Sequence, residues 1–83
     1  MSEHEADVLR VVAKLEERRR KRGISQRELA GLSGLSHSAI SEMESGKNSP
    51  TLHFLLRIAS ALEIDLGEIV TEACQDRKEK PTA

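Results

Sequence analysis

The chain has 83 residues, a net charge of −1 and a hydrophobic fraction of 37%, and Phe54 is its only aromatic residue. A chain of this length supports one modest core, and none of its apolar runs reaches the roughly eighteen residues that a membrane span requires. The single cysteine, Cys74, excludes an internal disulfide, so the composition favours a cytoplasmic protein with neither a secretory signal nor a membrane segment.

The first segment carries an apolar stripe at helical spacing, formed by Val8, Val11, Val12 and Leu15. The next position on this stripe is Arg19, whose permanent charge needs a partner if the side chain points inward. Glu44 is the nearest acid at the far end of the two-helix unit that follows. We therefore expect a partly buried ion pair between Arg19 and Glu44, the alternative being that Arg19 extends to water.

The stretch 26–44 has the pattern of two short helices separated at Gly34. Ser25 and Glu28 form the Ser-x-x-Glu capping box that starts the first of these helices. Gly34 can adopt the left-handed conformation that ends it, after which Ser36 can cap the next helix. The apolar residues that bring the two helices together are Leu29, Ala30, Leu35, Ile40 and Met43. This arrangement is a helix-turn-helix, whose second helix fits the DNA major groove.

The outward side of that second helix carries short polar side chains. If Ile40 and Met43 face the core, the exposed positions are His37, Ser38, Ser41 and Glu42. A histidine can donate to a purine N7, a serine can donate or accept, and a glutamate can accept from cytosine N4. We therefore expect these four residues to contact base edges, although His37 and Glu42 are also compatible with an ordinary solvated surface.

Positive charge is concentrated in residues 10–27, where eight bases and two acids give a local charge of +6. Because DNA affinity depends on neutralising phosphates, this segment favours a phosphate-facing patch, although basic residues at a helix end also complement the helix dipole. We expect individual phosphate contacts from the start of the second helix and from the loop after the third, through Gln26, Arg27, Lys47 and Asn48. Ordinary surface polarity is the alternative for these positions.

Two further helices complete the pattern. Thr51 caps a fourth helix whose apolar residues can cover the helix-turn-helix, namely Leu52, Leu55, Leu56, Ile58, Ala59 and Leu62. Asp65 caps a fifth helix, expected over residues 66–73. The sequence therefore predicts an all-α, compact five-helix fold in one DNA-binding domain, residues 1–74, followed by a polar flexible tail, residues 75–83.

Several linked motifs between residues 15 and 70 extend this interpretation. They are Gly23-Ile24-Ser25-Gln26, Glu28-Leu29-Ala30, Gly34-Leu35-Ser36, Ala39-Ile40-Ser41, Glu44-Ser45-Gly46-Lys47, Pro50-Thr51-Leu52 and Ile58-Ala59-Ser60-Ala61-Leu62. Together they resemble the phage-repressor (XRE, Cro-type) helix-turn-helix family of DNA-binding proteins. The resemblance implies a lambda-repressor-like fold, a phosphate contact from Gln26, base contacts from His37, Ser38 and Glu42, and an ion pair of Arg19 with Glu44.

These observations favour a sequence-specific transcriptional regulator, a repressor that binds a palindromic operator in double-stranded DNA as a homodimer. Two recognition helices related by symmetry read more base pairs than one, which is why small repressors dimerise. We expect the dimer interface at Ile69 and Val70 of the fifth helix, unless these residues only close the monomer core.

A second interpretation is a protein-interaction module, such as an antitoxin or coactivator, that uses the same fold to bind a protein partner. The near-neutral net charge and acidic flanks keep this interpretation open. DNA binding should weaken steeply as salt rises, because phosphate contacts release counterions, whereas binding through an apolar surface should not.

No pattern in the sequence indicates an enzyme. His4, His37, His53 and Cys74 lack metal-ligand spacing, and neither a nucleophile–base pair nor a phosphate-cradling glycine loop is visible. We therefore expect no catalytic residue, no metal and no cofactor.

Overall fold

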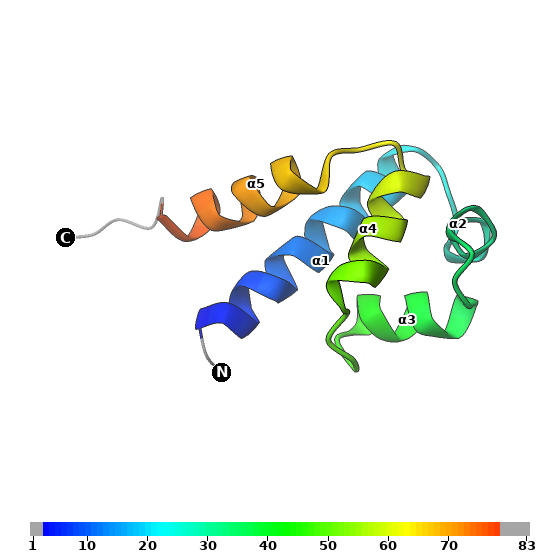
Figure 1. Ribbon diagram of the computed structural model, residues 1–83, viewed down its shortest axis with the longest axis horizontal. Helices are drawn as coiled ribbons and strands as arrows, with labels where there is room; N and C mark the ends of the chain where they lie inside the picture. The colour runs from blue at the N-terminus through cyan, green and yellow to red at the C-terminus, as the bar shows by residue number, and fades with distance from the viewer. Residues whose placement is uncertain (1–2, 79–83) are drawn as a thin grey trace.

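The computed structural model describes residues 3–78, and within this range all regular structure is helical. The helices are α1 (Glu3–Lys21), α2 (Gln26–Ser33), α3 (His37–Ser45), α4 (Leu52–Ala61) and α5 (Leu66–Lys78). Helices α1 and α5 lie side by side and run in opposite directions, and α2 contacts both α3 and α4 in a second group (Figure 1). The predicted all-α, five-helix fold is confirmed.

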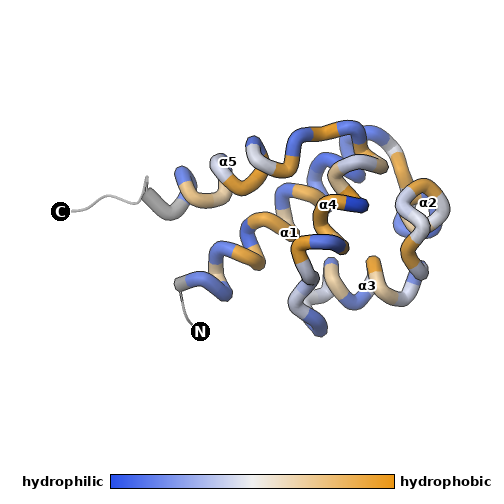
Figure 2. The backbone as a smooth tube through the Cα atoms, in the orientation of Figure 1, coloured by the Kyte–Doolittle hydropathy of each residue, from blue (hydrophilic) through white to orange (hydrophobic). Residues whose placement is uncertain are grey.

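The apolar faces of the helices meet in a single core, and Figure 2 shows the hydrophobic residues recurring along the helices between hydrophilic ones. Every helix contributes to it, and the largest fully buried side chains are Leu15, Leu29, Ile40, Ile58, Leu62 and Ile69. Burying one aliphatic side chain of this size contributes about 1.5–3 kcal/mol, so the packing of these faces is the main stabilising interaction.

The inward stripe of α1 ends in a charged side chain that is paired. Arg19 donates from Nε to Glu44 Oε2 at 2.8 Å and from Nη2 to Glu44 Oε1 at 2.9 Å, and its Nη1 donates to the Ile24 carbonyl at 2.7 Å. The two side chains of the ion pair are only 9% and 5% exposed. The hydrogen bond to Glu44 raises the pKa of Arg19 above its ordinary value. The expected pair is therefore present and links the end of α1 to the end of α3.

Side-chain caps begin the four later helices, as the sequence predicts. The hydroxyls of Ser25, Ser36 and Thr51 each accept a backbone N–H at 3.0–3.1 Å. The carboxylate of Asp65 accepts the N–H of Gly67 at 2.9 Å. These bonds satisfy donors that a helix start leaves without an intrahelical partner, so each element begins at a position fixed by its local sequence.

The end of α4 departs from the glycine pattern of the other helix ends. Gly23, Gly34 and Gly46 end α1, α2 and α3 with φ of 70°, 73° and 82°, but the equivalent position after α4 is Glu63, with φ of 57°. Arg22 binds this turn, donating to the Leu62 carbonyl and, at 3.1 Å, to the Glu63 carboxylate. The sequence has no glycine that would predict this turn. The turn is instead stabilised by Arg22, which is about forty residues away in sequence.

The buried face of α4 is narrower than the sequence suggested. Leu52 is 66% exposed and Leu56 is 50% exposed, so neither belongs to the core. The buried residues of the helix are Ile58 and Ala59, followed by Leu62 at its end. Leu52 and Leu56 are four residues apart and share one side of the helix, which faces away from the packed side.

Helix α5 is longer than expected, because it continues to Lys78 rather than ending near Ala73. Lys14 of α1 bonds Asp76 at 2.9 Å, and Arg18 bonds Glu72 at 3.2 Å. The hydrogen bond to Asp76 also raises the pKa of Lys14. These contacts extend the helix into the segment predicted as a tail, of which residues 79–83 lie outside the described residues.

The prediction that Ile69 forms a dimer interface is wrong. Its side chain is 0% exposed and packs in the monomer core, whereas the next residue, Val70, is 41% exposed. Two adjacent residues on a helix point about 100° apart, so both cannot face the same surface. Of the two residues predicted for the interface, only Val70 is exposed to a second molecule.

Candidate nucleic-acid interface

The turn between α2 and α3 is held from outside by α4. Gly34 ends α2 in a left-handed conformation, and its N–H donates to the Ala30 carbonyl at 3.0 Å. Arg57 donates from Nε to the Ser33 carbonyl at 2.9 Å, and a Cβ at position 34 would collide with its guanidinium group. The left-handed conformation therefore favours glycine here, and a larger residue would also have to displace the Arg57 guanidinium.

This turn places α3 along one edge of the molecule (Figure 1). Ile40 and Met43, 0% and 3% exposed, fix its inner face in the core. On the other side His37, Ser38 and Glu42 are exposed, and Ser41 is half-buried. The structure therefore gathers the four residues expected to contact bases on one helix, three of them open to solvent.

The polar groups of the first turn of α3 are not used inside the fold. Ser36 caps the helix by accepting the N–H of Ala39. Within the described part of the chain, the side chains of His37 and Ser38 make no hydrogen bond. Their donors and acceptors are available to an external molecule.

Glu42 and Asn48, expected to contact different parts of DNA, contact each other. The Asn48 amide donates from Nδ2 to Glu42 Oε1 at 2.8 Å, and both side chains are exposed. No pattern in the sequence predicted this bond. The available signal is the glycine at position 46, because a helix end of that kind reverses the chain and returns the next residues to the last turn.

Gln26 is also engaged within the fold. Its amide donates from Nε2 to Glu44 Oε1 at 2.8 Å, so it joins the ion pair of Arg19 with Glu44. The side chain is half-buried. One N–H and the carbonyl oxygen of a glutamine in this arrangement stay available for a further contact.

Arg27 and Lys47 lie in the first turn of α2 and directly after α3, and both are exposed. Among residues 3–78, no carboxylate lies within ion-pairing distance of either side chain. One uncompensated positive charge therefore lies at the start of the helix-turn-helix and another just after its end.

The remaining basic cluster is largely neutralised, in contrast to the patch that local charge suggested. Four arginines at the end of α1 and just after it each form an ion pair with a glutamate. The pairs are Arg18 with Glu72, Arg19 with Glu44, Arg20 with Glu16 and Arg22 with Glu63. Three of these acids come from distant parts of the chain, so the charge sum over residues 10–27 overstated the positive field.

A separate apolar surface lies between α4 and α5. It is an open groove whose apolar lining consists of Leu52, Leu56, Ala59, Ile64, Leu66 and Val70. Three of these lining residues are large and exposed, namely Leu52, Leu56 and Val70. We call this surface the α4–α5 groove.

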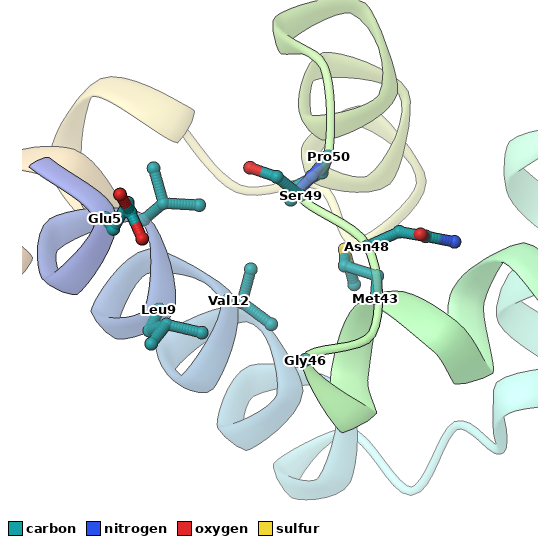
Figure 3. A pocket seen from close by; sticks show the side chains of 9 residues that line it. Glu5, Leu9, Val12, Met43, Gly46, Asn48, Ser49 and Pro50 are labelled. Atoms are coloured by element: carbon teal, nitrogen blue, oxygen red, sulfur yellow. The ribbon is translucent and has the colours of Figure 1, made fainter. Parts of the chain in front are cut away.

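A smaller hollow of about 210 Å³ lies between the first half of α1 and the loop after α3 (Figure 3). Its walls are mostly apolar, from Val8, Leu9, Val12, Met43 and Pro50.

No group of histidine, cysteine and carboxylate side chains suited to a metal ion occurs among residues 3–78. None of the described helices is long and apolar enough to cross a membrane.

Comparison with known proteins identifies the family. The helix-turn-helix family profile matches residues 15–69. The HTH-type transcriptional regulators PuuR of Escherichia coli (strain K12) and of Shigella flexneri are each 42% identical to this chain over 59 residues, which is 71% of this chain. The match covers only 32% of each regulator, so this chain corresponds to about a third of their length.

Two further comparisons extend over most of the matched protein. The uncharacterized HTH-type transcriptional regulator y4dJ of Sinorhizobium fredii (strain NBRC 101917 / NGR234) is 38% identical over 53 residues, which is 64% of this chain and 69% of that protein. The crystal structure of a mutant of the restriction-modification controller protein C.Esp1396I is similar with a TM-score of 0.75 and 25% identity, covering 96% of this chain and 100% of that one. The chain therefore belongs to the XRE-type helix-turn-helix family of DNA-binding transcriptional regulators.

Proposed function

We propose that this regulator is a sequence-specific repressor that binds a palindromic operator in double-stranded DNA as a cytoplasmic homodimer. The observation that supports it is the division of α3 into two faces. Ile40 and Met43 anchor one face in the core, while His37 and Ser38 expose unused polar groups on the other. A rigid helix with an accessible polar face suits the major groove, because bases are distinguished there by their donors and acceptors.

Base recognition is assigned to His37, Ser38, Ser41 and Glu42, and phosphate contact to Arg27 and Lys47. The two cations are exposed and lack carboxylate partners in the described range, so phosphates are suitable partners for both. Gln26 supplies a third contact, because the remaining N–H of its amide lies at the start of α2, where backbone N–H groups also favour an anion.

The second copy of the chain is proposed to bind at the α4–α5 groove. Val70 retains its predicted role there, and Leu52 and Leu56 take the place of the buried Ile69. Large exposed apolar side chains on two adjacent helices are typical of an interaction surface. A palindromic operator requires that this contact be symmetric and that the two copies of α3 lie on one side of the dimer.

Repression needs no more than occupancy of the operator. A dimer that fills an operator excludes other proteins from the same stretch of DNA, and the family gives this chain a DNA-binding role rather than an enzymatic one. The proposal therefore requires no catalytic residue or cofactor.

The deciding experiment is the selection of bound sequences from a random DNA pool by the purified chain, followed by affinity measurements at several salt concentrations. We expect an enriched palindrome, and an affinity that falls steeply with salt. The Lys47→Ala variant should lower affinity for all sequences equally and reduce the slope of the logarithmic salt dependence by about 1. Enrichment of no sequence, with salt-insensitive binding to a protein partner, would instead support the interaction-module interpretation.

A further inference from the structure

The loop after α3 folds back onto the helix through a built helix end. Gly46 has φ of 82°, and its N–H donates to the Met43 carbonyl at 3.1 Å. The N–H of Lys47 donates to the Glu42 carbonyl at 2.9 Å, and Ser45 Oγ donates to the same oxygen at 3.0 Å. These bonds reverse the chain and set the position of the next residue relative to Glu42.

That next residue is Asn48, whose side chain points toward α3. Figure 3 shows Asn48 directed away from the hollow beside α1, whereas Ser49 is directed into it. The Asn48 amide reaches Glu42 Oε1 at 2.8 Å. Within the described residues it is the one side-chain donor to this carboxylate, which belongs to an exposed residue.

This bond restricts a side chain that would otherwise be free to rotate. An exposed glutamate has several accessible rotamers, and fixing it on a base edge costs conformational entropy. A hydrogen bond that exists before DNA arrives lowers that cost, because the carboxylate is already ordered. It leaves Oε2 without a partner, and Oε2 can accept from an exocyclic amine such as cytosine N4.

From these contacts we infer that Asn48 is a positioning residue, which acts on base recognition by orienting the Glu42 carboxylate and does not contact a phosphate. This inference rests on the proposed function, in which Glu42 reads a base. It replaces the phosphate contact that the sequence suggested for Asn48, because its amide binds the Glu42 carboxylate, which pairs with no cation among the described residues and whose negative charge disfavours a phosphate beside it.

The test compares Asn48→Ala with Glu42→Ala on the selected operator and on its single-base variants. Glu42→Ala identifies the base pair at which preference depends on the carboxylate. We expect Asn48→Ala to relax preference at that same base pair by roughly threefold to tenfold, and at no other. Lys47→Ala is the matched neighbouring control, and it should weaken all sequences by one common factor.

Three outcomes would overturn the inference. In the first, Asn48→Ala lowers affinity for every sequence equally, as the loss of a phosphate contact would. In the second, Glu42→Ala changes no base preference. In the third, the Asn48→Ala and Glu42→Ala effects on preference add in the double variant, whereas an effect transmitted through Glu42 should disappear in the Glu42→Ala background.

A measurement without DNA separates this inference from the function beneath it. The NMR signals of the Asn48 side-chain amide should shift in Glu42→Ala and stay unchanged in Ser38→Ala. If the amide signals shift as expected but the wild-type chain selects no DNA sequence, the proposed function fails together with the role of Asn48. If the chain selects an operator but these signals do not shift, only the positioning role is overturned.

Discussion

The carboxylate of Glu44 joins three helices. It accepts two hydrogen bonds from Arg19 at the end of α1 and one from Gln26 at the start of α2. Because it is itself in α3 and only 5% exposed, it is shielded from the water that would otherwise stabilise its charge. A buried charge is tolerated when its hydrogen bonds are complete, so these contacts fix how α3 sits against α1 and α2.

Replacing Arg19 with alanine should therefore lower the free energy of unfolding by about 3–5 kcal/mol, since Glu44 would stay buried without its cation. Urea denaturation measures this effect. The control is Arg20→Ala, which removes an exposed pair with Glu16 and should cost about 1 kcal/mol or less. Similar losses in the two variants would contradict the structural role of the buried pair.

Glu63 holds a backbone conformation that favours glycine. Its φ of 57° closes the end of α4, and a side chain in this conformation costs about 1 kcal/mol. Glu63→Gly should raise the free energy of unfolding by about that amount, because its exposed ion pair with Arg22 contributes little. Glu63→Ala is the matched control, since it removes the same ion pair but keeps the strain. Thermal unfolding in which Glu63→Gly is no more stable than Glu63→Ala would count against this explanation.

Among the helices, α2 depends most on its ends. It has eight residues, too few for an isolated helix to be stable in water. Ser25 and Glu28 form a reciprocal capping box at its start, with bonds of 2.9 and 3.0 Å. Arg57 binds its last carbonyl at 2.9 Å. The element that positions α3 is thus held by a local motif at one end and a distant side chain at the other.

The capping box predicts a pH effect. The Ser25 backbone N–H, and then the Ser25 side chain, lower the pKa of Glu28 below its ordinary value. A carboxylate whose pKa is lowered on folding stabilises the native state above its unfolded pKa, and this stabilisation is lost as pH falls through the folded pKa. Wild type should therefore lose its advantage over Glu28→Gln, which keeps an acceptor but does not titrate, between about pH 5 and pH 3. Urea midpoints of both proteins over this range measure the difference, and a constant difference would rule the effect out.

At the level of the whole molecule, polar and apolar surfaces have separate places. The exposed polar groups His37, Ser38 and Glu42 lie on α3, and the exposed leucines Leu52 and Leu56 lie on α4. A regulator that binds DNA through one surface and a second copy through another needs this separation, because the two contacts must form together.

The groove gives a prediction about assembly. Val70→Asp should abolish self-association, because it would place a charge in the apolar contact between the two copies. It should not unfold the chain, because Val70 is 41% exposed in the monomer and a charge there stays hydrated. Leu9→Asp is the matched control, since Leu9 is 43% exposed but lies on α1, away from the groove. Sedimentation equilibrium measures the dimer constant. Equal dimerisation of the two variants would exclude the α4–α5 groove as the interface.

Much of the fold and of the candidate site was predictable from sequence because it depends on neighbours along the chain. The caps at Ser25, Ser36 and Thr51 act over three residues, and apolar spacing predicted the buried side of α3 at Ile40 and Met43. The exposure of His37 follows from the same spacing. Arg19 was predictable because a permanent charge on an apolar stripe demands a partner.

Other features were decided only when the helices packed. Periodicity identifies a stripe on a helix but not where the neighbouring helices lie, so it could not separate the buried Ile69 from the exposed Val70 or remove Leu52 from the core. The local sequence predicted a free basic patch from the arginines. In the folded chain, acids from distant segments neutralise them, as Glu72 does for Arg18 from 54 residues away in sequence. Interactions within one helical turn are determined by the local sequence, whereas contacts across the core depend on the angles at which whole helices pack.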